Sequence, residues 1–191
     1  MNTEELNALK ERAYKTAVAH GFHEDVKPDA YYLGLVMSEA GEAINADRKG
    51  LHADTSLFTL NIENGLSFKD NFEQYIKDSV EDEIADIVIR LLDFAGMEGY
   101  KPLISPTSVW LLQAITETFA ENGLPGTLFA LIGTLSDSLD DDNTEATVGV
   151  VINIFSECFE MMTGSDCDLW WFVEKKMAYN ELRPKLNGKK Y

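Results

Sequence analysis

Cysteine is scarce in this sequence, which has only Cys158 and Cys167 among its 191 residues. Neither lies in a Cys-x-x-Cys pair or beside a histidine, so neither a zinc site nor a disulfide framework is indicated. The N-terminal segment has no apolar signal core, and no run approaches the roughly 18 apolar residues of a membrane span. We therefore expect a cytoplasmic protein that has no membrane partner.

Basic residues are also few. The chain has 16 Lys and Arg against 33 Asp and Glu, which gives a formal net charge of -17 at pH 7. The resulting negative potential repels a phosphate backbone, so we expect no nucleic-acid polymer as a partner. A small phosphorylated ligand differs because it can enter with a divalent cation, which neutralises both the phosphates and the carboxylates around the metal.

The apolar residues predict an all-α helical bundle. Hydrophobic residues make up 45% of the chain, which is enough for one core, and we treat residues 1–191 as a single domain. Residues 51–68 lack a period and are predicted to form an ordered loop that can include a short strand-like segment. Helical spacing covers seven other segments, the third with a break near Ser79: residues 3–20, 29–49, 70–96, 106–121, 126–139, 145–163 and 166–182.

Two pairs of acidic residues lie on successive predicted helices. In SEAGEAINADRKG, Glu39 and Glu42 are at i and i+3, which places them side by side on one helix face. In VEDEIADIVIRLLD, Glu83 and Asp86 repeat this spacing at the border of an apolar stripe. Like charges so close to a core disfavour each other's ionised form, and a bound cation removes that cost.

Carboxylate oxygens are the ligands that hard divalent cations prefer. We therefore expect Mg²⁺, or Mn²⁺ in its place, on Glu39, Glu42, Glu83 and Asp86, which are also our candidate catalytic residues. The competing interpretation is a solvated acidic helix face, since this spacing is common on the surfaces of acidic proteins. Periodicity alone does not decide between the two.

Cations concentrate at the C-terminal end of this acidic chain. In KKMAYNELRPKLNGKK, Lys176, Asn180 and Arg183 lie at i, i+4 and i+7 and share one helix face before Pro184. Arginine grips phosphate oxygens bidentately and lysine adds a point charge, so we predict that these residues, extended by Lys189, contact a triphosphate. The alternative is a favourable placement of basic residues at the negative end of a helix dipole.

Together these stretches resemble the MazG-like, all-α nucleoside-triphosphate pyrophosphohydrolases, a superfamily that includes the dimeric dUTPases and the dCTP pyrophosphatases. SEAGEAINADRKG and VEDEIADIVIRLLDFAG resemble its ExxE…ExxD motif, and KMAYNELRPKLNGKKY resembles the ending of one branch. The resemblance implies a bundle that assembles as a homodimer or homotetramer. It also implies Mg²⁺-dependent hydrolysis of a nucleoside triphosphate to a monophosphate and pyrophosphate, with the four acids on the metal and the C-terminal residues on the phosphates.

The chain departs from that pattern in three places. Glu42 and Glu83 are separated by 40 residues, more than the motif usually spans, so an insertion must loop out between the two helices. Asn187 stands where the tail pattern has histidine, and residues 100–165 match no motif. These departures keep open a helical module that binds nucleotide or metal without turnover. A ferritin-like di-iron protein would need an ExxH pattern, which none of the three histidines completes.

The base specificity of such a protein depends on the shape of a pocket, which periodicity does not reveal. Aromatic side chains can stack on a nucleobase, but at helical spacing they more often belong to the core. The sequence does not choose among the candidates, which are Phe22, Tyr31, Phe58, Trp110 and Trp171.

Overall fold

The structure, a computed structural model, describes residues 1–102, 106–139 and 143–188, and within these ranges it contains helices and loops but no strand. The predicted all-α fold class is thereby confirmed. The elements are α1 (Thr3–Ala19), α2 (Asp29–Lys49), α3 (Thr55–Glu63), α4 (Phe68–Tyr75), α5 (Val80–Met97), α6 (Val109–Ser138), α7 (Thr144–Thr163), α8 (Leu169–Glu181) and the short 3-10 helix η1 (Lys185–Gly188).

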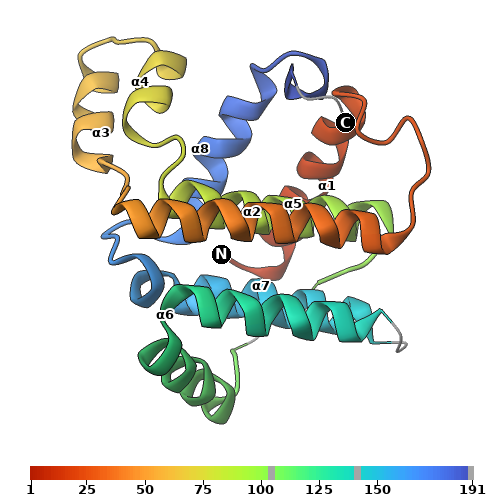
Figure 1. Ribbon diagram of the computed structural model, residues 1–191. Helices are drawn as coiled ribbons and strands as arrows, with labels where there is room; N and C mark the ends of the chain where they lie inside the picture. The colour runs from red at the N-terminus through yellow and green to blue at the C-terminus, as the bar shows by residue number, and fades with distance from the viewer. Residues whose placement is uncertain (103–105, 140–142, 189–191) are drawn as a thin grey trace.

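Helix α5 lies at the centre of the bundle, with α1, α2, α7 and α8 packed against it (Figure 1). A helix that is apolar around most of its circumference needs partners on several sides, which explains this arrangement. Helices α6 and α7 form a layer below α2 and α5 in Figure 1, while α1 and α8 lie above them. The completely buried apolar residues of α5 include Ile84, Ile87, Val88, Leu91 and Leu92.

The local signals for helix ends agree with the structure in most places. Asn2 and Glu5 form a complete capping box at the start of α1. Gly50 ends α2 with a φ of 64°, a left-handed conformation that glycine adopts at little cost. Ser79 separates α4 from α5, and its hydroxyl accepts a hydrogen bond from the Asp82 backbone N–H at 3.2 Å. The predicted break near Ser79 is therefore confirmed.

The prediction of a loop over residues 51–68 is wrong for its central part, because Thr55–Glu63 forms α3. Asp54 caps this helix, accepting a hydrogen bond from the Leu57 backbone N–H at 2.8 Å. Phe58 is buried, whereas Leu57 and most other apolar residues of α3 are exposed. The apolar positions therefore follow no single stripe, which is why the sequence showed no helical period here.

The middle of the chain contains α6 and α7. The two helices predicted over 106–121 and 126–139 are joined in α6, where Gly123, with φ 63° and ψ -167°, interrupts the helical backbone. In length and composition alone, α7 could cross a membrane. However, 61% of its apolar window is buried inside the bundle, so its hydrophobic residues serve the core.

Gly96 permits the close approach of α1 and α5, because a Cβ atom added there would lie 2.6 Å from the Tyr14 Cβ atom. We expect Gly96→Ala to lower the free energy of unfolding by about 1–3 kcal/mol, since Tyr14 or the backbone must shift. Gly34→Ala in α2 is the matched control: its added Cβ would meet no atom within 4 Å. It should raise stability by about 1 kcal/mol. Urea unfolding measures both, and equal effects would contradict close packing at Gly96.

Candidate metal and phosphate site

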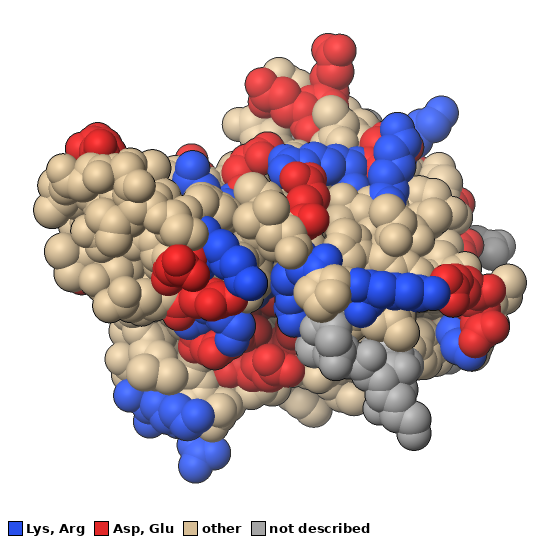
Figure 2. All heavy atoms as spheres, turned by 90° about the horizontal axis from the view of Figure 1, so that it is seen from above, with Lys and Arg blue, Asp and Glu red and all other residues tan. Residues whose placement is uncertain are grey.

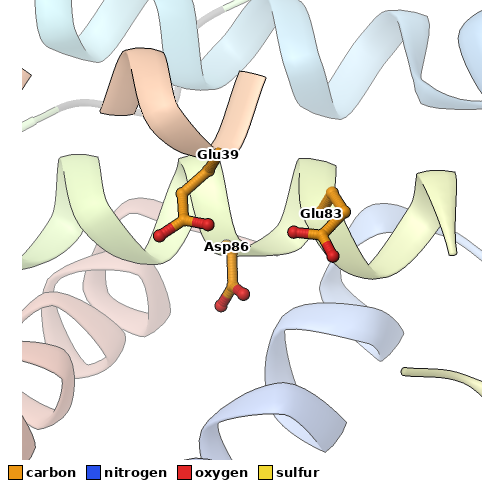
Figure 3. A group of neighbouring side chains, drawn as sticks. All are labelled: Glu39, Glu83 and Asp86. Atoms are coloured by element: carbon orange, nitrogen blue, oxygen red, sulfur yellow. The ribbon is translucent and has the colours of Figure 1, made fainter. Parts of the chain in front are cut away.

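Three carboxylates meet where α2 packs against α5. Glu39 comes from α2, and Glu83 and Asp86 come from successive positions on one face of α5 (Figure 3). One oxygen from each residue lies within 4.8 Å of the others. Oxygens on opposite sides of a Mg²⁺ ion are about 4.2 Å apart, because each Mg–O distance is about 2.1 Å. A small closure of the side chains would therefore seat one hard cation, and the donor set fits Mg²⁺ or Mn²⁺.

Glu83 is the acid that most needs such a cation. It is 4% exposed, and its carboxyl has no hydrogen bond or ion pair with any residue that the structure describes. Burial, followed by the charge of Asp86, raises the pKa of Glu83 to about 8. Ionising a buried carboxyl that has no partner costs free energy, and a bound cation would offset that cost.

Glu39 has a cationic partner already. The Arg90 guanidinium donates to Glu39 Oε1 from Nε at 3.0 Å and from an η nitrogen at 2.9 Å. Arg90 was not among the site residues predicted from the sequence. The signal was present, however, because Arg90 is the one basic residue in the apolar run of α5 and stands four positions after Asp86.

Glu42 lies apart from the other three predicted metal ligands. It is exposed on α2, outside the group formed by Glu39, Glu83 and Asp86. Glu42 and Glu83 nevertheless line one pocket, together with Lys49, and the charge of Glu42 is among the causes that raise the pKa of Glu83. Metal binding by Glu42 stays a prediction, with the side chain at the edge of the site.

Lys176 lies inside the acidic cluster. Its Nζ atom is 2.6 Å from Asp82 Oδ2 and 2.8 Å from Asp86 Oδ2, and the residue is buried. Burial alone would lower the pKa of Lys176, but the charges of Asp82 and Asp86 raise it above its usual value, so the ammonium stays charged. The phosphate contact predicted for Lys176 remains a prediction, because these carboxylates hold its head group.

Asn180 and Arg183 lie beside the acids, but α8 ends at Glu181, so Arg183 lies past the helix face on which the sequence placed it, and contact of either residue with phosphate stays a prediction. They line one pocket with Glu39, Asp86 and Arg90. This pocket therefore has metal-binding oxygens on one part of its wall and amide and guanidinium donors on another, which suits phosphate groups. Lys189, the fourth predicted substrate contact, lies outside the described residues.

Two of the five aromatic candidates are placed near this pocket. Phe22 lines it, and Tyr31 lines an adjoining pocket that also contains Phe22 and Arg90. Phe58 is buried, with its ring centroid 5.6 Å from that of Trp171, so both belong to a different cluster under α3. Trp110 is 72% exposed at the start of α6.

Further acids and a histidine surround the site. Asp93 is buried next to His23, whose Nε2 atom lies 2.7 Å from Asp93 Oδ1, and it lines the same two pockets as Arg90. Asp82, Asp86 and Asp93 recur along one side of α5, although only Asp86 was predicted from the sequence as a site residue. Seen from the side of α1 and α8, acidic side chains gather near the middle of the molecule with basic side chains next to them (Figure 2).

No protein-family model matches the chain, and no curated protein or solved structure is similar to it at a significant level. A fold class as general as a helical bundle does not identify a function. Function is therefore inferred from the geometry of this site and from the motif strings that the site residues belong to.

The carboxyl of Glu83 makes the stability of the metal-free protein depend on pH. Its pKa is about 8 in the folded protein against 4.5 for the ordinary group, so the folded state holds the proton longer than the unfolded chain. The protonated carboxyl therefore contributes its full share of the free energy of unfolding below pH 4.5, and this contribution is lost as the pH rises to about 8. We expect the melting temperature in a chelator to fall between pH 6 and 8. Burial raises the pKa of Asp82 to about 6 only, so a fall above that pH is assigned to Glu83.

The variant Glu83→Gln cannot ionise and should abolish most of that fall. Glu42→Gln, which removes an exposed acid from the neighbouring helix, serves as the control and should leave most of the fall in place. Differential scanning calorimetry at a series of pH values measures both. A fall of the same size in Glu83→Gln as in the unaltered protein would show that another group is responsible.

Proposed function

We propose that the protein hydrolyses a nucleoside triphosphate to a nucleoside monophosphate and pyrophosphate, with Mg²⁺ or Mn²⁺ as cofactor. The observation that carries this proposal is the placement of three converging carboxylates beside a pocket that Arg90, Asn180 and Arg183 also line. A triphosphate enters such a site as its metal complex, so it needs carboxylate oxygens and phosphate donors side by side. The resemblance of the motif strings to the MazG-like pyrophosphohydrolases supports the same reaction.

Each residue of the site has a role in this proposal. Glu39, Glu83 and Asp86 would hold the metal, with Glu42 at the edge of the set. When bound, the ion polarises a phosphate oxygen and lowers the pKa of a water molecule. Asn180 and Arg183 bind and orient phosphate oxygens, and Lys189 extends this set. Phe22 and Tyr31 offer ring faces to the base, as their position in and beside the pocket supports.

The proposal is tested by incubating the protein with Mg²⁺ and a panel of ribo- and deoxyribonucleoside triphosphates while pyrophosphate is measured. We expect release from at least one of them. Glu39→Gln and Asp86→Asn should each lower kcat by about 100-fold or more, because each removes a ligand of the metal. The matched control is Glu121→Gln, an exposed acid on α6, which should keep full activity. No pyrophosphate from any substrate, or full activity in both site variants, would refute the proposal.

A nucleotide-binding module without turnover is the second candidate. It is favoured by Lys176, whose ammonium is held by Asp82 and Asp86 instead of facing the pocket freely. In that case calorimetry would show tight binding of the nucleotide–Mg²⁺ complex, and the substrate panel would release no pyrophosphate. The two measurements together separate the candidates.

We also propose that the chain assembles as a homodimer or homotetramer. Large apolar side chains are exposed on α3 and α6, among them Leu60 at 52% and Trp110 at 72%. Exposed apolar groups of this kind mark association surfaces when they form a patch. Sedimentation velocity should give two or four times the chain mass of 21.4 kDa. Whichever of Leu60→Ser and Trp110→Ser lowers that mass identifies the surface, and a single-chain mass for the unaltered protein would contradict the assembly.

A further inference from the structure

Lys176 is buried in an unusual place for a lysine. Lysine side chains normally keep their ammonium groups in water, but Lys176 on α8 is 4% exposed and reaches α5 between Asp82 and Asp86. These two acids stand at i and i+4 on α5, so both present an oxygen to the same point. The Lys176 ammonium lies 2.6 Å and 2.8 Å from those oxygens.

Asp82 is held in one orientation by its burial and by two hydrogen bonds to its carboxylate. Its residue is 0% exposed, and its Oδ2 atom accepts hydrogen bonds from both Lys176 Nζ at 2.6 Å and the Asp78 backbone N–H at 3.1 Å. Its Oδ1 atom is buried and has no hydrogen-bond partner. A fully buried carboxylate with such partners cannot turn toward the pocket, so Asp82 serves to hold Lys176.

The charged side chains of the site limit the number of metal ions that it can bind. Four buried or half-buried carboxylates belong to the cluster, from Glu39, Asp82, Glu83 and Asp86, and two cationic side chains are paired with them, Arg90 and Lys176. The Lys176 ammonium occupies the point between Asp82 and Asp86 at which a second cation could bridge these two carboxylates. A divalent ion brought to that point would meet the buried ammonium at close range, where two positive charges repel each other strongly.

We propose that Lys176 is a built-in counter-cation that takes the place of a second divalent ion, so that each chain binds one divalent cation, on Glu39, Glu83 and Asp86. Asp82 is then a positioning residue that keeps the ammonium against Asp86. The inference rests on the metal site of the proposed function. It adds that one of the positive charges next to the phosphates is supplied by the protein and is independent of the metal concentration.

The experiment is a titration with Mn²⁺ in which free Mn²⁺ is followed by its electron paramagnetic resonance signal. The unaltered protein should bind one Mn²⁺ per chain. Lys176→Met should bind two, because the second ion can bridge Asp82 and Asp86 where the ammonium was. The double variant Lys176→Met with Asp82→Asn should return to one, since that bridge then lacks a carboxylate. Lys175→Met is the matched control and should stay at one, because Lys175 lies over the Trp171 ring, away from the acids.

Two Mn²⁺ ions per chain in the unaltered protein, or one in Lys176→Met, would overturn the inference. If Lys176→Met does not fold, as judged by circular dichroism, Asp82→Asn decides. There Lys176 keeps Asp86 as its one acidic partner and competes with the metal for it, so Mn²⁺ affinity should fall about tenfold or more. An unchanged affinity would refute the positioning role. One Mn²⁺ per chain without pyrophosphate release from the substrate panel would refute the hydrolase and leave this inference standing.

Discussion

Carboxylates that are buried inside a helical bundle must each find a positive or hydrogen-bonding partner, and this demand is concentrated on α5. The partners come from segments far apart in the sequence: the link before α2, the link after α2, and α8. The contacts join Asp93 to His23 at 2.7 Å, Glu81 to His52 at 2.9 Å and Asp82 to Lys176 at 2.6 Å. Apolar packing alone is tolerant of small shifts, so these polar contacts fix how the neighbouring elements sit on α5.

The candidate site is the part of this network in which one buried carboxyl lacks a partner among the described residues. Glu83 shares the burial of its neighbours on α5 but has no partner in the described chain, and it faces Glu39 and Asp86. Because these residues stand on two long, well-packed helices, the spacing of their oxygens is set by the core and not by a loop. A cation that binds here therefore meets a preformed set of ligands, which the core already holds in place.

Much of the fold could be predicted from the sequence, because apolar residues at helical spacing and a few caps determine most of its elements. Helix α3 could not, since Phe58 is its one buried residue and a single buried position has no period. The acid pairs were visible as well, but their partners were not. Lys176 is 94 residues from Asp82, and no local pattern reveals that α8 lies against α5. A lysine at that spacing from an asparagine and an arginine looks the same whether it faces phosphate or carboxylate, so the predicted phosphate contact could not take Asp82 and Asp86 into account.

The long segment between the two acid pairs need not disturb the site, because its ends are tied together. The Val80 backbone N–H donates to Leu51 O at 3.0 Å, and the Ala53 N–H donates to Glu81 Oε2 at 3.0 Å, so the chain leaves α2 and enters α5 at one place. Closing a longer loop costs little extra, about 0.6 kcal/mol for each doubling of its length. The segment folds as the α3–α4 pair outside that closure, while α2 and α5 remain in contact. The 40 residues between Glu42 and Glu83 thus constrain the site less than the hydrogen bonds at the base of this segment do.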